Sequence, residues 1–140
     1  MPHALIDWEY AGPVDPLVEL AQVCWLNAKL YDDIVAKIED PPSVAERTRQ
    51  LRAIIDGYEL SRKLRQGFVE KIIEFVVMAT ANEADEADEA DEADEADEAD
   101  ILIDTSLSSL SKQAPWALAW CARSAAWIMQ NRQLLQNALT

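Results

Sequence analysis

Apolar residues recur at steps of three and four along most of the chain, the spacing that places them on one face of an α-helix. In the first third of the chain these positions are Leu17, Leu20, Ala21, Cys24, Ala28, Tyr31, Ile34 and Val35. They predict one long amphipathic helix from Asp15 to about Glu39, with Asp15 as N-cap and Pro16 at the first helical position. Pro41 disfavours helix at the residue before it, so the helix should end there.

Two more helices are predicted in the middle of the chain, before the acidic repeat. Ser43 and Glu46 have the spacing of a capping box, in which each side chain bonds the backbone of the other residue. The helix that they start has Leu51, Ile54 and Ile55 on its inner face and Gly57 as a C-cap residue. A third, strongly apolar helix is predicted from Ser61, with Gly67 inside it at a cost of about 1 kcal/mol relative to Ala.

From Glu83 to Asp100 the sequence consists of six Glu-Ala-Asp triplets. A helix turns by about 100° per residue, so each triplet shifts its Ala by about 60° and no apolar face forms. Like charges three residues apart cost a few tenths of a kcal/mol per pair, whereas Ala and Glu are good helix formers. We expect an exposed, mobile acidic segment that extends the third helix for some turns and then frays. An inert tract is the preferred interpretation, and an interaction tail the alternative.

The last predicted helix starts near Pro115, after a Ser-rich linker at residues 104–111. Trp116, Trp120, Arg123, Trp127 and Leu134 fall on one of its faces. Tryptophan rings can bind a cation, but a tryptophan stripe at helical spacing is more typical of a protein core. We therefore predict that this face packs into the core.

The formal net charge of -14 comes mostly from one place, because 12 of the 26 acidic residues lie in the triplet tract. The other 14 acidic residues nearly balance the 12 Lys and Arg residues. Nucleic-acid binding needs clustered basic residues that neutralise phosphates. Six basic residues do cluster, but they fall on predicted exposed helix faces, so we expect no nucleic-acid partner. They are Arg47, Arg49, Arg52, Arg62, Lys63 and Arg65.

Candidate chemistry is sparse outside the N-terminus. Cys24 and Cys121 lie in apolar helical sequence without a second ligand at metal-binding spacing, which predicts buried free thiols in a reducing cytoplasm. His3 is the only histidine. The longest apolar run, Ile72 to Ala79, is interrupted by Glu74 and is much shorter than the roughly 20 residues that span a bilayer. No secretory signal is visible, so we expect a soluble cytoplasmic protein with no membrane partner.

The N-terminus suggests chemistry more clearly than any other stretch. Ala4 to Ile6 is a short apolar run that predicts a strand, and this strand would present the carboxylate of Asp7 at its end. A Gly12-Pro13 turn follows, before the helix that starts at Asp15. Taken alone, Asp7 could simply accept hydrogen bonds in the turn. The strand, the turn and the capped helix together predict a local structure that holds the Asp7 carboxylate in place.

Ile6-Asp7-Trp8-Glu9, followed by Asp15-Pro16-Leu17-Val18-Glu19-Leu20-Ala21, resembles the metal-binding segment of the aminoglycoside phosphotransferase and choline kinase family. The resemblance implies that Asp7 binds Mg²⁺ on the phosphates of ATP, a role that suits a carboxylate. It also implies that Asp15 and Glu19 support this site, although Glu19 replaces the usual Asp of the family. The implied fold is mainly α: the helical C-terminal lobe of a protein-kinase-like fold with a short N-terminal strand remnant.

Most parts that phosphoryl transfer requires are missing from the chain. The family's His-Gly-Asp catalytic loop lies upstream of the metal segment, but here only Met1, Pro2 and His3 precede the strand, and no Gly-rich phosphate loop exists. We assign no catalytic or nucleotide-binding residue. The resemblance implies the truncated C-terminal part of a kinase that phosphorylates the hydroxyl of a small molecule. We expect no turnover, and no tight binding of Mg²⁺ or ATP, by this chain alone.

The predicted organisation is a single helical domain over residues 1–140. It comprises the strand and metal-site loop at 1–14, three helices at 15–82, the acidic repeat at 83–100, and a linker with the Trp-rich helix at 101–140. The alternative hypothesis is a non-enzymatic helical interaction domain with an acidic arm. Exposed apolar residues such as Leu5, Ile6 and Trp8 would then make it a homo-oligomer.

Overall fold

A computed structural model describes residues 15–37, 39–97 and 105–140. The elements within these ranges are α1 (Pro16–Asn27), α2 (Asp33–Ala36), α3 (Val44–Gly57), α4 (Arg62–Arg65), α5 (Phe68–Asp97), α6 (Thr105–Gln130) and α7 (Arg132–Leu139). All are helices, and the described residues contain no strand, which confirms the prediction of a mainly α fold. The predicted strand remnant lies outside the described ranges. The single-domain organisation stays a prediction.

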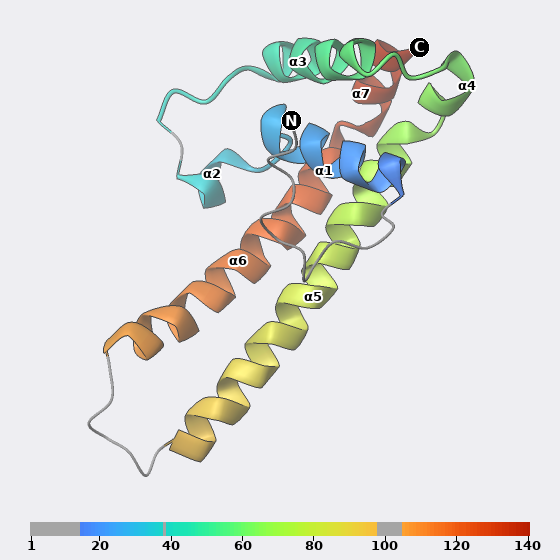
Figure 1. The fold of residues 1–140 in the computed structure, drawn as a ribbon. Coiled ribbons are helices and arrows are strands. Elements are labelled where there is room, and N and C mark those ends of the chain that lie inside the picture. The colour runs from blue at the N-terminus through green and yellow to red at the C-terminus, as the bar shows by residue number, and fades with distance from the viewer. Residues whose placement is uncertain (1–14, 38, 98–104) are drawn as a thin grey trace, which may run out of the picture.

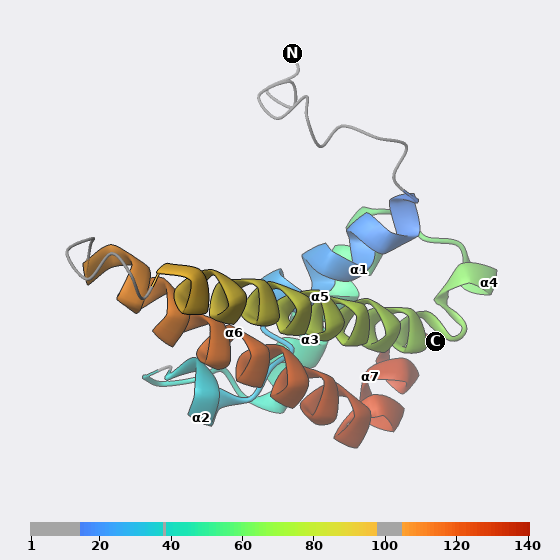
Figure 2. The ribbon, with the colours of Figure 1, turned by 90° about the horizontal axis from the view of Figure 1, so that it is seen from below.

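The two longest helices, α5 and α6, lie side by side, with the end of α5 and the start of α6 at the same end of the pair (Figure 1). The short helix α1 packs across α5 near the other end of this pair (Figure 2), and α3 packs against α7 (Figure 1). The molecule is therefore a helical pair with a compact head, and the long α5–α6 arm extends away from it. The head brings together segments from both ends of the described chain.

The core is one cluster of buried apolar side chains in this head. Its members are Leu20, Ala21, Cys24, Trp25, Ala28, Leu30, Leu51, Ile55, Phe68, Val69, Ile72, Ile73, Val76, Cys121, Ala125, Ile128, Leu135 and Leu139. The predicted inner face of the second helix is confirmed, because Leu51 and Ile55 are fully buried and Ile54 packs against the cluster. Burying one such side chain stabilises the fold by about 1.5–3 kcal/mol.

The single helix predicted from Asp15 to about Glu39 is wrong. α1 ends at Asn27, and Lys29 follows in the left-handed region with φ of 56°. Asp32 then starts α2, because its side chain accepts a hydrogen bond from the Ile34 N–H at 2.8 Å. A turn at this point takes the chain away from α1, and the local caps compensate for the interrupted helical hydrogen bonds.

The second predicted helix is confirmed as α3. The Ser43 hydroxyl accepts a hydrogen bond from the Glu46 N–H at 3.1 Å, and Glu46 Oε2 accepts one from the Ser43 N–H at 3.3 Å. This reciprocal pair is the predicted capping box. Gly57 is the last residue of α3, and Tyr58 takes the C-cap position.

The start of the third predicted helix is wrong, whereas its extension is confirmed. Ser61 caps only the four-residue helix α4. Gly67 lies between α4 and α5 with φ of +73°, where glycine avoids the strain of a side chain, so it is not inside a helix. α5 continues through the acidic triplets to Asp97. Residues 98–104 lie outside the described ranges, and the mobility of the tract stays a prediction.

The predicted start of the last helix near Pro115 is also wrong, because α6 begins at Thr105 and contains Pro115. Proline removes one backbone donor from a helix interior, but packing of α6 along α5 offsets that loss. The predicted face is divided between two helices, since α6 ends at Gln130 and Leu134 belongs to α7. No helix among the described residues combines the length and the apolar character needed to cross a membrane.

Candidate functional site

The predicted magnesium ligand, Asp7, lies outside the described residues, so its metal role stays a prediction. Asp15 is the N-cap of α1, as predicted, and its Oδ1 accepts a hydrogen bond from the Leu17 N–H at 2.9 Å. Glu19 is exposed in the first turn of the same helix. Within the described ranges, no three His, Cys, Asp or Glu side chains gather as metal ligands.

Both cysteines are buried free thiols, as predicted. Burial raises the pKa of Cys24 to about 12. Burial, helped by the negative charge of Glu83, raises the pKa of Cys121 to about 11. Because the thiolate is the reactive form of cysteine, neither sulfur is a nucleophile near neutral pH.

The tryptophans form a stack that joins three helices. Trp25 of α1 stacks on Trp120 of α6 with ring centroids 4.8 Å apart. Trp116 of α6 also stacks on Trp120, with ring centroids 6.0 Å apart. Phe75 of α5 meets Trp25 edge-on at 6.1 Å. Trp120 and Trp127 pack against the core, as predicted. The prediction is wrong for Trp116, Arg123 and Leu134 of the same face, which are exposed. The stack stabilises the junction of α1, α5 and α6.

The predicted exposure of Arg47 is wrong: this residue of α3 is the most buried charged side chain in the described structure, with 2% of its surface exposed. It forms an ion pair with Asp33 and donates a hydrogen bond to the Tyr31 carbonyl oxygen at 3.0 Å. Its guanidinium carbon also lies 5.2 Å from the centre of the Trp127 ring, which is cation–π geometry. Arg47 therefore joins α2 and the chain before it to α3 and α6.

The segment from Lys29 to Pro42 is a loop whose two ends come together. Its neighbouring carboxylates bind different helices: Asp33 pairs with Arg47 of α3, and Asp32 pairs with Arg123 of α6 at 3.0 Å. Two ion pairs therefore hold the loop against the body of the molecule. A compact loop with adjacent ends is a common location for binding residues.

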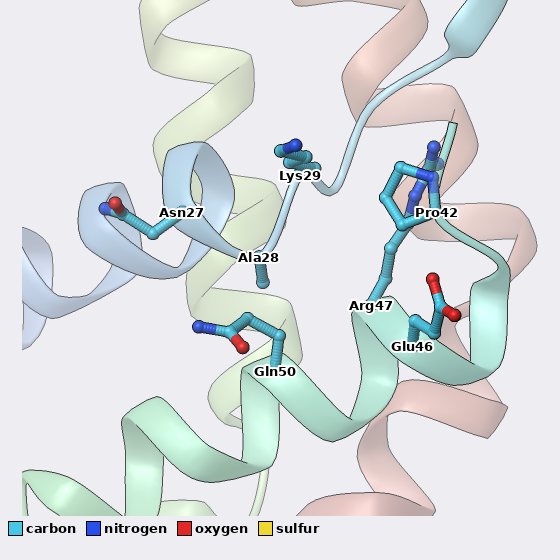
Figure 3. A pocket seen from close by; sticks show the side chains of 7 residues that line it. All are labelled: Asn27, Ala28, Lys29, Pro42, Glu46, Arg47 and Gln50. Atoms are coloured by element: carbon cyan, nitrogen blue, oxygen red, sulfur yellow. The ribbon is translucent and has the colours of Figure 1, made fainter. Parts of the chain in front are cut away.

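A pocket of about 290 Å³ lies where the ends of this loop meet, between the end of α1 and the start of α3 (Figure 3). It is lined by Asn27, Ala28, Lys29, Pro42, Glu46, Arg47 and Gln50. This pocket could not be predicted from the sequence, because its residues come from two segments that only the unpredicted turn at Lys29 brings together. Three of these residues were predicted in other roles: Ala28 on an apolar helix face, Glu46 in the capping box and Arg47 on an exposed face.

Two opposite charges face the pocket from its two sides. Lys29 lies on the α1 side and Glu46 on the α3 side (Figure 3). Both are exposed, and neither forms an ion pair with another described residue. The Gln50 amide lies below them, and Ala28 and Pro42 add apolar surface. The pocket thus offers a cation, an anion, an amide and a small apolar patch.

The chain is similar to the trifolitoxin immunity protein of Rhizobium leguminosarum bv. trifolii. The two are 45% identical over 141 aligned positions, which cover 99% of this chain and 47% of that protein. This chain therefore spans about half the length of the relative. No protein-family model matches the chain, and no solved structure matches it either.

This similarity overturns the predicted relationship to the aminoglycoside phosphotransferase and choline kinase family. That resemblance rested on two short segments, Ile6 to Glu9 and Asp15 to Ala21, whereas the match to the immunity protein covers nearly the whole chain. The predicted function, part of an ATP-dependent small-molecule kinase, is wrong for the same reason. A carboxylate after a short apolar run, followed by a capped helix, is too common a local pattern to identify an enzyme family.

Proposed function

We propose that this chain acts in immunity to a toxin and that it does so by binding the toxin without covalent chemistry. The observation that carries the proposal is the 45% identity to the trifolitoxin immunity protein over nearly the whole chain. Because the chain spans about half of that protein, protection by the chain alone is itself part of the proposal. The finer fold prediction of a kinase-like lobe plays no part, since it rested on the overturned resemblance.

The site geometry supports binding as the means of protection. The pocket between α1 and α3 combines charged, amide and apolar groups, the mixture by which proteins orient small ligands or the side chains of a partner. It lies in the head, where Arg47, one of its lining residues, contacts Asp33, the Tyr31 carbonyl and the Trp127 ring. The two thiols favour the same interpretation, because burial keeps them protonated.

Expression of the chain in cells sensitive to trifolitoxin tests the proposal. The cells should grow at toxin concentrations that stop cells with an empty vector, and cells with the full-length relative provide the positive control. Circular dichroism of the purified chain should show the helical fold. If the folded chain gives no protection where the relative protects, the proposed function is wrong.

Binding is tested separately with the purified chain and purified trifolitoxin. Isothermal titration calorimetry should detect a reversible complex, and mass spectrometry of both partners afterwards should show unchanged masses. A changed toxin mass would contradict protection by binding alone, and protection without a detectable complex would do the same.

A further inference from the structure

We propose that the pocket between α1 and α3 binds a zwitterionic group of amino-acid size, with its carboxylate toward Lys29 and its ammonium toward Glu46. The pocket is about 290 Å³ in volume, near the lower end of the roughly 300–1,000 Å³ that ligand pockets usually have. A small ligand therefore fills it. Such a ligand would meet both charged walls at once.

Several arginines of the head form ion pairs with carboxylates. Arg47 pairs with Asp33, Arg123 with Asp32, Arg65 with Asp56, and Arg132 with Glu70. Lys29 and Glu46 lie across one pocket, yet neither has an ion-pair partner among the described residues. A ligand that carries both charges would give each of them a partner.

The charge balance of the pocket favours a zwitterion over a simple ion. Arg47 also lines the pocket, but Asp33 neutralises its charge. The remaining lining charges are one cation, Lys29, and one anion, Glu46. A simple anion would be attracted by the first and repelled by the second, and a simple cation the reverse. A ligand with both charges, correctly oriented, avoids either repulsion.

Hydrogen bonds hold the backbone turn at Lys29 and the carboxylate of Glu46. The Ala28 N–H bonds the Cys24 carbonyl at 3.0 Å and the Leu30 N–H bonds the Trp25 carbonyl at 3.0 Å, so the turn that carries Lys29 is held on both sides. Glu46 is held by the capping box through Oε2. Walls that are already in place reduce the entropy that binding must overcome.

The pocket also has groups that would contact the rest of an amino acid. Gln50 offers an amide donor and acceptor, while Ala28 and Pro42 offer apolar surface for a short side chain (Figure 3). The zwitterion could be a free amino acid or a pair of opposite charges presented by a toxin. Only the second source rests on the proposed function.

Titration of the purified chain with L-leucine, N-acetyl-leucine and leucinamide tests the charge requirement. N-acetyl-leucine lacks the ammonium group, and leucinamide lacks the carboxylate. Chemical shifts of backbone amides at Lys29, Glu46 and Gln50 should move with L-leucine, and the two blocked compounds should bind at least about tenfold more weakly, because each leaves one pocket charge unpaired. Equal binding of all three, or binding of none, would overturn the proposal.

Two variants test the residues while preserving the local backbone. Lys29→Asn removes the cation, and Asn tolerates the left-handed conformation of this position. Glu46→Gln removes the anion but retains a residue type that completes a capping box. Each variant should weaken L-leucine binding at least about tenfold.

Matched controls lie outside the pocket. Lys37 and Glu59 are exposed and, like Lys29, have a left-handed backbone conformation, with φ of 51° and 55°. Neither residue lines the pocket. Lys37→Asn and Glu59→Gln should leave L-leucine binding unchanged. If these controls weaken binding as much as the pocket variants, general charge effects explain the result and the proposed site is wrong.

The protection assay separates the two sources of ligand. If folded Lys29→Asn and Glu46→Gln variants lose both L-leucine binding and protection, the toxin supplies the charges. If they lose L-leucine binding but still protect, the pocket binds a free amino acid. If the unaltered chain binds L-leucine but gives no protection, the site stands and only the proposed immunity function fails.

Discussion

The guanidinium of Arg47 lies 5.2 Å from the centre of the Trp127 ring, with its edge engaged by Asp33 and the Tyr31 carbonyl. One side chain of α3 thus holds α6 and the loop that precedes α3. Burial makes its pairing energetically important, because a buried charge without its partner is strongly destabilising. The neighbouring pair, Arg123 with Asp32, has a half-exposed arginine and the same chemistry.

Replacing Arg47 by Met should lower the free energy of unfolding by about 2–4 kcal/mol, because the variant loses the ion pair, the cation–π contact and a charged hydrogen bond. The matched variant Arg123→Gln should lose only about 0–1 kcal/mol, because its guanidinium is exposed to water. Urea unfolding followed by circular dichroism measures both. Equal losses in the two variants would contradict the central role of Arg47.

Replacing Gly67 by Ala should lower the free energy of unfolding by about 1–2 kcal/mol, since φ of +73° strains any residue with a Cβ. Gly57→Ala is the matched control. A new Cβ meets nothing within 4 Å at either position, so the comparison isolates backbone conformation. Gly57 is the last residue of α3 and does not have a positive φ, so Ala is favoured there by up to about 1 kcal/mol. The two substitutions should therefore change the melting temperature in opposite directions.

The stability of the fold should fall in acid partly through Asp56. A hydrogen bond from Arg65, reinforced by the charges of Arg65 and Arg52, lowers the pKa of Asp56 below its ordinary value of 3.8. The folded state therefore binds this proton less readily than the unfolded chain. The resulting stability is present above pH 3.8 and is lost as the pH falls through the lower, folded-state pKa.

The substitution Asp56→Asn measures that contribution. The variant should show a shallower loss of stability between about pH 5 and pH 2 than the unaltered chain, because one shifted carboxylate has been removed. Thermal unfolding at a series of pH values gives the two slopes. Parallel pH profiles would show that Asp56 makes no acid-dependent contribution.

The thiols should be unreactive in the folded protein. Burial raises the pKa values of Cys24 and Cys121 to about 12 and about 11, so a disulfide reagent added at pH 8 should modify neither on the timescale of minutes. In urea both thiols should react at once. Rapid modification of the folded chain, with its helical spectrum retained, would contradict the buried placement of these residues.

The features that were predicted correctly depend on residues that lie close together in the sequence. Ser43 and Glu46 specify the start of α3 because the capping box needs only a three-residue spacing. The break at Lys29 could not be predicted in this way. It accompanies the pairing of Asp33 with Arg47 and the complete burial of Leu30, which are contacts between segments distant in sequence. Such tertiary contacts override helical periodicity.

The candidate site was missed for the same reason. Lys29 and Glu46 face one pocket only because the loop between them returns to α3. The start of α6 was predicted wrongly because Pro115 is a strong local signal for a helix start. The packing of α6 along α5 is a contact between distant segments, and no short stretch of sequence indicates it. Asp7 lies outside the described residues, and the sequence alone supports its predicted metal role.

The acidic triplets give α5 a length that is independent of the core. Among the described side chains of α5, those that belong to the core or pack against it lie at or before Ala79, whereas the helix continues to Asp97. At about 1.5 Å per residue, one added or deleted triplet would move the end of α5 by about 4.5 Å and rotate it by about 60° relative to a whole turn. The number of triplets thus determines how far α5 extends from the core and in which direction its last turn faces.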